Sequence, residues 1–307
     1  MPIAIISHPD CGLHDMGSGH PEQPARLSAI FDRLIASGLE MIVRQIDAPL
    51  ATREQLERVH EPHYVQSVFD QAPTEGLIML DPDTAMGPHT LAAALRAAGA
   101  VVHAVDLVMN REFQAVFCAV RPPGHHAERD RAMGFCFFNN VAVGAAHALA
   151  AHGLERVAIV DFDVHHGNGT EHIFETEPRV LFCSSFQHPF YPFTGHETDT
   201  PHIVNITLPA GSDGARFRDE VERHWLHRLH EFQPQLVLIS AGFDGHAEDD
   251  MSHVRLREPD YIWITRELKK VADQYASGRI VSTLEGGYNL SALGRSAVAH
   301  IDALLGH

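Results

Sequence analysis

The repeated alternation of short apolar runs with longer helical patterns limits the possible folds of this chain more than any other feature. From residue 115 onward, the apolar runs have the length and composition of buried strands. The predicted strands are 115–120, 156–161, 179–184, 203–208, 235–240 and 279–284, and the predicted helices are 138–152, 168–176, 214–231, 258–276 and 289–305. This order is typical of βαβ units, which build a parallel sheet between helices. We therefore predict an α/β protein.

The residues before 115 follow a looser pattern. We predict a strand at 3–8, a loop at 80–84, and helices that begin near Pro21 and recur at 53–59, 61–71 and 88–110. No repeat or linker divides the chain, so residues 1–307 are expected to form one domain. No apolar run approaches the roughly 18 residues of a membrane span, and the N-terminus lacks the basic segment of a signal peptide. We therefore expect no membrane association.

Polar and glycine-rich motifs follow five of the predicted strands. They are Arg121-Pro-Pro-Gly-His125-His126, Asp161-Phe-Asp163-Val-His165-His166-Gly-Asn168-Gly, Ser184-Ser185, Ala-Gly-Phe-Asp244 and Glu285-Gly-Gly-Tyr288-Asn. In open α/β sheets, ligand sites lie beyond the carboxyl ends of the strands. Five such strand ends therefore indicate one shared site.

The motif after strand 156–161 indicates a metal centre. Alternate residues of a strand share a face, so Asp161, Asp163 and His165 are expected to point the same way. Buried carboxylates are costly unless they are paired or bind a cation, and a carboxylate with an imidazole is a suitable ligand set for Zn²⁺. Asp244 would supply a third protein ligand. The alternative is a helix N-cap followed by a solvated turn.

Two further motifs carry groups suited to catalysis. His125 and His126 follow a Pro-Pro-Gly turn, from which both could reach one pocket as acid and base groups. Tyr288 follows two glycines and could donate a hydrogen bond to an oxyanion. The alternatives are a solvated loop for the histidines and packing at a turn for the tyrosine.

Charge and cysteine content restrict the partners and the compartment. The formal net charge of −17 argues against non-specific nucleic-acid binding and is compatible with a cationic substrate. The four cysteines form no CxxC pair and are interpreted as thiols in a reducing compartment, which predicts the cytoplasm.

Together with Gly134-Phe135-Cys136, these motifs resemble the zinc-dependent histone deacetylase superfamily, which includes acetylpolyamine amidohydrolases and bacterial deacetylase-like amidohydrolases. The resemblance extends from about His20 to Leu304, with the motifs in the family's order and spacing. It implies the arginase–deacetylase fold, a central parallel sheet of about eight strands between helices. It also implies one catalytic Zn²⁺ on Asp163, His165 and Asp244. One or two structural K⁺ ions are implied on Asp161, Ser184 and Ser185, with the backbone carbonyls of Asp163 and His165.

The resemblance also implies catalytic roles. His126 resembles the general base that deprotonates water and then protonates the leaving amine, and His125 resembles its electrostatic companion, paired with Asp161. Asn168 occupies a position where some members carry Asp, and it would orient His126 without adding charge. Tyr288 matches the tyrosine that polarises the acyl carbonyl.

Substrate-binding residues are implied in the same way. Phe135 and Tyr191 resemble the aromatic walls of an acyl-lysine tunnel, and Gly134 offers a carbonyl to the substrate amide. Arg26 resembles the arginine at the inner end of the tunnel, and Asp83 resembles a rim aspartate that holds a peptide backbone.

The implied reaction is hydrolysis of an acylated amine, with acyl-lysine in a peptide or protein as the first candidate substrate. Acetylpolyamines or other small amides are the second candidate. A non-catalytic binding protein of the same fold is a third interpretation, and arginase-like manganese chemistry is weakened because no second Asp follows two residues after Asp244. We expect no nucleic-acid or membrane partner and allow for a homo-oligomer.

Overall fold

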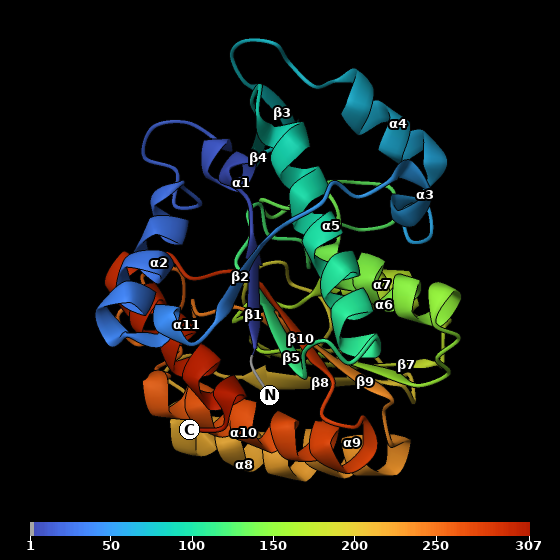
Figure 1. Cartoon of the computed structure of the whole chain (residues 1–307), viewed down its shortest axis with the longest axis vertical. Coiled ribbons are helices and arrows are strands. Elements are labelled where there is room, and N and C mark those ends of the chain that lie inside the picture. The colour runs from blue at the N-terminus through green and yellow to red at the C-terminus, as the bar shows by residue number, and fades with distance from the viewer. Residues whose placement is uncertain (1–2) are drawn as a thin grey trace.

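An eight-stranded parallel sheet forms the centre of the computed structural model, which describes residues 3–307 (Figure 1). The strands lie in the order β2-β1-β5-β10-β9-β6-β7-β8, and every neighbouring pair is parallel. Their bounds are β1 Ala4–Ser7, β2 Arg44–Asp47, β5 Ala115–Cys118, β6 Val157–Asp161, β7 Val180–Gln187, β8 Ile203–Leu208, β9 Leu236–Ala241 and β10 Ile280–Leu284. The predicted α/β class and the parallel sheet of about eight strands are confirmed.

Helices cover both faces of this sheet (Figure 1). One layer consists of α5 Thr90–Met109, α6 Asn140–Ala151 and α7 Asn168–Phe174, with α1 Pro9–Leu13 against α5. The other contains α2 Ala25–Ser37, α8 Gly214–Val221, α9 His227–Phe232, α10 Glu258–Tyr275 and α11 Leu290–Leu305. The short helices α3 Arg53–Leu56 and α4 Pro62–Asp70 lie beyond the first layer. Because both faces are covered, the inner strands β5, β10, β9, β6 and β7 are buried along their whole length and are mostly apolar.

Strand order brings the sequence motifs together. β6 lies between β9 and β7, and its last residue, Asp161, is in register with Ser240 of β9 and Ser184 of β7. β10 lies on the far side of β9, and β5 follows β10. The five strands that precede the polar motifs are therefore adjacent, and all of them end at the same edge of the sheet.

The structure differs from the predicted elements at four places. Residues 80–84 belong to a β-hairpin, β3 Ile78–Asp81 and β4 Thr84–Met86, so the predicted loop is wrong; its Pro-Asp signal marks only the turn. The sequence analysis missed α1 and also missed β2, an edge strand without a buried apolar pattern. The predicted helix 214–231 is divided by a π-helical turn, Glu222–Leu226, between α8 and α9.

By length and composition alone, helix α5 is long and apolar enough to cross a membrane. It contains no uninterrupted apolar run of that length, because Arg96 and Asp106 lie within it. In the most apolar window of this helix, 67% of the residues are buried inside the protein. Because α5 packs against α6 and the sheet, it occupies the position of a core helix.

Candidate active site

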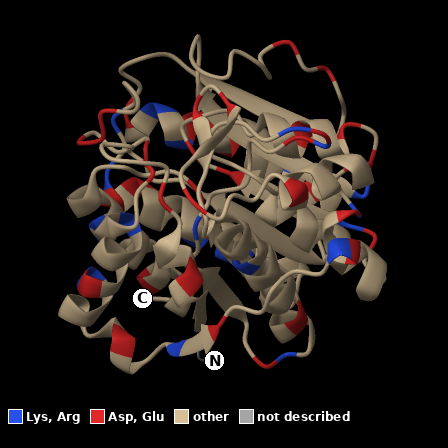
Figure 2. Ribbon diagram, turned by 90° about the horizontal axis from the view of Figure 1, so that it is seen from above, with Lys and Arg blue, Asp and Glu red and all other residues tan. Residues whose placement is uncertain are grey.

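The predicted site lies at the carboxyl edge of the sheet, which Figure 2 shows from above with acidic residues among the overlying loops. Asp163, His165 and Asp244 come together there, and all three are buried. The Nδ1 atom of His165 lies 3.1 Å from Oδ1 of Asp163 and 3.1 Å from Oδ2 of Asp244. These three side chains can therefore offer one imidazole nitrogen and two carboxylate oxygens to a single metal ion.

The expectation that Asp161, Asp163 and His165 share one strand face is wrong. β6 ends at Asp161, so Asp163 and His165 lie in the following loop rather than on a strand face. Two carboxylates hold this loop. Asp163 Oδ1 accepts the backbone N–H of His165 at 2.9 Å, and Oδ1 of Asp244, from the loop after β9, accepts that of Val164 at 3.0 Å. Asp161 turns away from this group, toward His125.

The surroundings of these three residues fit a divalent cation. Burial and the neighbouring charge of Asp163 raise the pKa of Asp244 to about 6, so a bound cation would favour the ionised form of this carboxylate. Glycines leave the space around them open. A Cβ at Gly242 would lie 2.1 Å from Oδ2 of Asp163, and one at Gly286 would lie 2.1 Å from Oδ2 of Asp244. Zinc is a suitable metal for this nitrogen and oxygen ligand set.

The tandem histidines have opposite electrostatic environments. Burial alone would lower the pKa of His125, but Asp161, 2.9 Å away, and Asp163 outweigh it and raise this pKa to about 10. Within residues 3–307, the partner of His126 is an amide and not a carboxylate, since its Nδ1 lies 2.7 Å from Oδ1 of Asn168. Burial, together with positive charge on His125 and His165, holds the pKa of His126 well below its usual range. The pair thus consists of a cation beside a neutral imidazole.

Glu285 anchors the histidine turn, a role that the sequence analysis did not assign although the residue belongs to a quoted motif. Its Oε2 accepts the backbone N–H groups of Gly124 at 2.7 Å and His125 at 3.1 Å, and its Oε1 accepts the hydroxyl of Ser240 at 3.1 Å. Burial raises the pKa of Glu285 to about 7. One buried carboxylate therefore ties the ends of β5, β9 and β10 together.

Tyr288 is held from two sides. Oδ2 of Asp249 accepts its backbone N–H at 2.6 Å, and the guanidinium carbon of Arg26 lies 4.9 Å from the centre of its ring. Arg26 also donates to the carbonyls of Gly287 at 2.6 Å and Glu285 at 2.5 Å. Burial raises the pKa of Tyr288 well above its usual value, so its hydroxyl keeps a proton to donate.

A buried ionic network lies behind Arg26 and was also missed. Glu22 accepts a bidentate interaction from Arg121 and a hydrogen bond from Nη1 of Arg26 at 3.1 Å. Burial by itself would raise the pKa of Glu22, but the Arg121 guanidinium outweighs it and holds this pKa well below its usual range. Arg121, the arginine of the Arg-Pro-Pro-Gly-His-His motif, thus supports the site from the core.

A cavity of about 300 Å³ opens beside His165, one of the three candidate metal ligands. Its lining consists of Asp83, His126, Gly134, Phe135, His165, Phe190, Tyr191, Asp250, Met251 and Tyr288. Tyr191 lies edge-on to His126, with ring centres 5.4 Å apart, and Phe190 stacks on His165 at 5.7 Å. Phe135 lies edge-on to Tyr288 at 6.0 Å. Phe190 and Met251 are lining residues that the sequence analysis did not select.

Gly134 and Asp83 form one corner of this cavity. Gly134 has a φ of +57°, and a Cβ there would lie 2.4 Å from Cδ2 of His126, so both conformation and space require glycine. Oδ1 of Asp83 accepts the backbone N–H of Gly134 at 3.0 Å and the hydroxyl of Thr84 at 2.7 Å. The predicted rim aspartate therefore holds the turn that carries Gly134.

Ser184 and Ser185 lie at the end of β7, beside Asp161. Both serines are buried, and the hydroxyl of Ser184 has no hydrogen-bond partner within the described part of the chain. An unpartnered buried hydroxyl next to a carboxylate is compatible with a bound cation.

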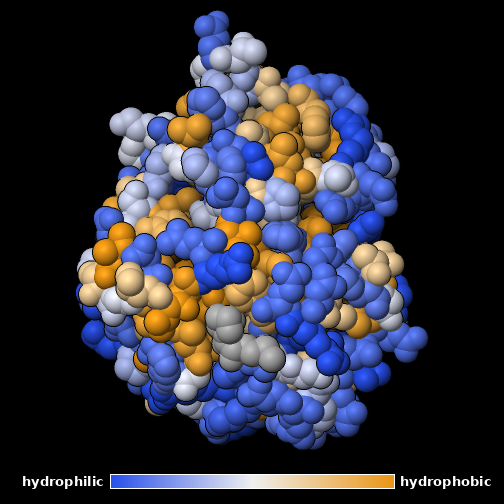
Figure 3. Space-filling view, in the orientation of Figure 1, coloured by the Kyte–Doolittle hydropathy of each residue, from blue (hydrophilic) through white to orange (hydrophobic). Residues whose placement is uncertain are grey.

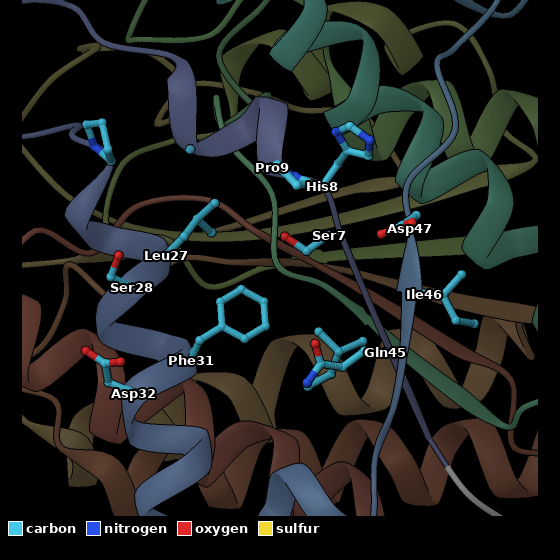
Figure 4. Close-up of a pocket in the computed structure, with 13 residues that line it drawn as sticks. Ser7, His8, Pro9, Leu27, Ser28, Phe31, Asp32, Gln45, Ile46 and Asp47 are labelled. Atoms are coloured by element: carbon cyan, nitrogen blue, oxygen red, sulfur yellow. The ribbon is translucent and has the colours of Figure 1, made fainter.

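A larger cavity, of about 640 Å³, lies away from these residues, between α2 and the edge strand β2. Leu27 and Phe31 of α2 project into it toward Gln45 of β2 (Figure 4). Hydrophobic residues gather on part of the surface shown in Figure 3. Ile35 of α2 and Met41 are among the exposed large apolar side chains. Its lining includes His8 but, among the described residues, none of the candidate metal ligands, neither of the tandem histidines and not Tyr288.

The comparison with protein families identifies the class of enzyme. A family model described as histone deacetylase domain matches residues 20–304, so the chain belongs to the histone deacetylase family. Membership of this family, together with the likeness to deacetylase relatives and a deacetylase-type structure, makes the protein a deacetylase, which is a hydrolase.

Individual relatives agree with this assignment. The chain is 38% identical over 99% of both chains to the uncharacterized protein slr0245 of Synechocystis sp.. It is 36% identical to the human polyamine deacetylase HDAC10, with 100% of this chain matching 48% of that protein. The crystal structure of the HDA15 HD domain superposes with a TM-score of 0.92 at 32% identity, covering 100% of this chain and 90% of that one.

Proposed function

We propose that this protein is a zinc-dependent amidohydrolase that removes acetyl or related acyl groups from lysine side chains of peptides or proteins. The observation that carries the proposal is the buried group of Asp163, His165 and Asp244 at the base of an apolar cavity, beside the neutral imidazole of His126. One catalytic domain comprising residues 1–307 would perform this reaction.

Asp163, His165 and Asp244 would hold the zinc ion. A Zn²⁺ ion bound there would supply a Lewis acid for the acyl carbonyl and lower the pKa of a water molecule. The two carboxylates balance the charge of the metal, and their burial keeps competing water away from the reacting amide.

His126 would act as the general base. Its Nδ1 faces Asn168, so its Nε2 is the nitrogen available to take a proton from the attacking water. The lowered pKa keeps this nitrogen free of a proton at neutral pH. After attack, the same nitrogen would return the proton to the departing amine, while His125 stays protonated on Asp161 and stabilises negative charge.

Tyr288 would stabilise the tetrahedral oxyanion. Its hydroxyl is protonated and lines the same cavity as His126 and His165. Arg26 and Asp249 hold it in place before substrate arrives, and donors fixed in advance stabilise developing charge at little reorganisation cost.

The shape of the cavity supports a linear acylated chain as substrate. Phe135, Phe190, Tyr191 and Met251 would surround the methylenes of an acyl-lysine, and Gly134 would offer its carbonyl to the amide. Acetylated polyamines are the second candidate. Two carboxylates, Asp83 and Asp250, line the cavity, and one relative is described as a polyamine deacetylase.

Further features belong to the same proposal. Asp161, Ser184 and Ser185, with the carbonyls of Asp163 and His165, would bind structural K⁺, which the unpartnered Ser184 hydroxyl supports. Four buried free cysteines support a reducing compartment such as the cytoplasm, and the protein could work as a monomer or a homo-oligomer.

Turnover of an acetyl-lysine peptide and of N-acetylputrescine by the zinc-loaded protein tests the proposal. We expect peptide turnover that is lost, together with bound zinc, in Asp163→Ala. Preference for N-acetylputrescine would instead establish the polyamine assignment. A zinc-loaded protein that turns over neither substrate would contradict both.

A further inference from the structure

Glu128 is connected to the base histidine through one intervening amide. Its Oε1 accepts a hydrogen bond from Nδ2 of Asn168 at 2.7 Å. On the other side of the amide, Oδ1 of Asn168 lies 2.7 Å from Nδ1 of His126. Asn168 is buried, and only 14% of the Glu128 side chain is exposed. The three residues form a chain of hydrogen bonds that leads from the edge of the site to His126.

The direction of the Asn168 amide follows from the chemistry of Glu128. An ionised carboxylate can only accept hydrogen bonds, so it requires the NH₂ group of Asn168 on its side. The sulfur of Met133, a weak acceptor, lies 3.3 Å from the same Nδ2 atom. The amide oxygen is therefore turned toward His126, where it can accept a hydrogen bond only from an Nδ1–H group.

Glu128 is itself held in place by a neighbouring side chain and by its own backbone. Arg131 donates to Oε1 at 2.8 Å and to Oε2 at 3.1 Å. The backbone of Glu128 is anchored as well, since its N–H donates to the Arg131 carbonyl and its carbonyl lies 2.8 Å from Nδ1 of His60. The carboxylate that orients Asn168 thus has little freedom to move.

We propose that Glu128 is a positioning residue that sets the tautomer of His126 by orienting Asn168. With the hydrogen on Nδ1, the lone pair of His126 lies on Nε2, the nitrogen that faces the cavity. A reversed Asn168 would present its NH₂ group to Nδ1 and would move the hydrogen to Nε2, where it blocks proton uptake. This inference rests on the proposed role of His126 as general base.

Replacing Glu128 with a donor tests the direction of the amide. In Glu128→Lys, the ammonium group donates to Oδ1 of Asn168 and turns the amide around. We expect kcat to fall by about tenfold to a hundredfold, the range of a charge-assisted hydrogen bond, while KM changes by less than about threefold. Arg179→Ala removes the Arg179–Glu177 ion pair, which involves none of these residues, and is the control; its kcat should stay within about twofold of wild type.

A second substitution should reverse the effect. In Asn168→Asp, a carboxylate can accept from the lysine and from Nδ1–H together, so Glu128→Lys/Asn168→Asp should recover kcat relative to Glu128→Lys. Asn168→Asp alone places two carboxylates side by side and should lower kcat. A folded double variant no better than Glu128→Lys would overturn the proposal, because simple loss of packing or charge at position 128 gives no such rescue.

The ring ¹⁵N resonances of His126, assigned by their loss in His126→Gln, provide a readout that does not depend on activity. We expect an Nδ1–H tautomer in the wild type and an Nε2–H tautomer in Glu128→Lys. If Glu128→Lys does not fold, Glu128→Gln, which can accept or donate, should show both tautomers. A single Nδ1–H tautomer in the variant would overturn the role of Glu128. If the wild type does not hydrolyse acylated amines, the proposed function is overturned. The tautomer measurement would still test whether Glu128 sets the tautomer of His126.

Discussion

The side chains of His125 and Asp161 form a buried ion pair, with Nδ1 of the histidine 2.9 Å from Oδ2 of the aspartate. The pair joins the loop after β5 to the end of β6, and it places a fixed positive charge beside the neutral His126. Since the two ring centres of the tandem histidines are only 4.0 Å apart, any change in the charge of His125 should change the pKa of His126.

Substitution of Asp161 should therefore affect catalysis. Asp161→Asn keeps a hydrogen-bond acceptor and removes the charge, so the pKa of His125 falls and its cation is lost near neutral pH. We expect kcat to decrease by about tenfold or more, since hydrogen bonds to charged groups contribute about 1.5–3 kcal/mol. Steady-state kinetics at matched zinc content measure the change, and an unaltered kcat would argue against an electrostatic role for His125.

The pH profile should report the lowered pKa of His126. Its neutral form is the active one, so kcat/KM should stay level as the pH falls through 6.5 and decline only at lower pH, where His126 becomes protonated. In Asn168→Asp, the added negative charge raises this pKa and moves the acidic limb to higher pH. An identical acidic limb in both proteins would assign that limb to another group.

Tyr288 should contribute only to the transition state. We expect Tyr288→Phe to lower kcat by about 10²–10³-fold with little change in KM, by analogy with the loss of one oxyanion donor. Arg26 still stacks on the phenylalanine ring in this variant, so the backbone geometry is retained. Near-normal turnover by Tyr288→Phe would remove the tyrosine from the mechanism.

Glu22 should contribute strongly to stability. Glu22→Gln leaves the buried guanidinium of Arg121 without its charge partner and should lower the free energy of unfolding by about 3–5 kcal/mol, measured by urea denaturation. Because the folded pKa lies below the unfolded one, this contribution is complete above about pH 4.5 and is lost as the pH falls toward the folded pKa. An exposed pair provides the control, and Glu177→Gln should cost less than about 1 kcal/mol.

Much of this architecture could be predicted because the signals are local. The inner strands are mostly apolar, and β8 was placed at its observed bounds, 203–208. The hairpin at β3 and β4 and the edge strand β2 could not be recognised, because β2 is exposed and the turn residues of the hairpin also suit a loop. Edge strands lack the buried pattern on which such predictions depend.

The three candidate metal ligands lie close together in the structure, but strand alternation does not explain their meeting. Asp163 and His165 lie beyond the end of β6, and hydrogen bonds from the backbone of His165 and Val164 shape the loop that carries them. Their proposed roles follow from the family resemblance and the chemistry of the residues, and the experiments above test them.

The sequence by itself determined the parallel sheet, the edge at which the site lies and the chemical groups available there, because apolar periodicity and residue type are properties of short segments. The tertiary structure alone decided how these groups are supported. Glu285, Asp249, Glu22 and Glu128 each lie far along the chain from at least one group that they hold, at separations of 161, 39, 99 and 40 residues. Removing a carboxylate from water costs free energy unless a partner compensates for it, and only folding brings these partners within hydrogen-bonding distance.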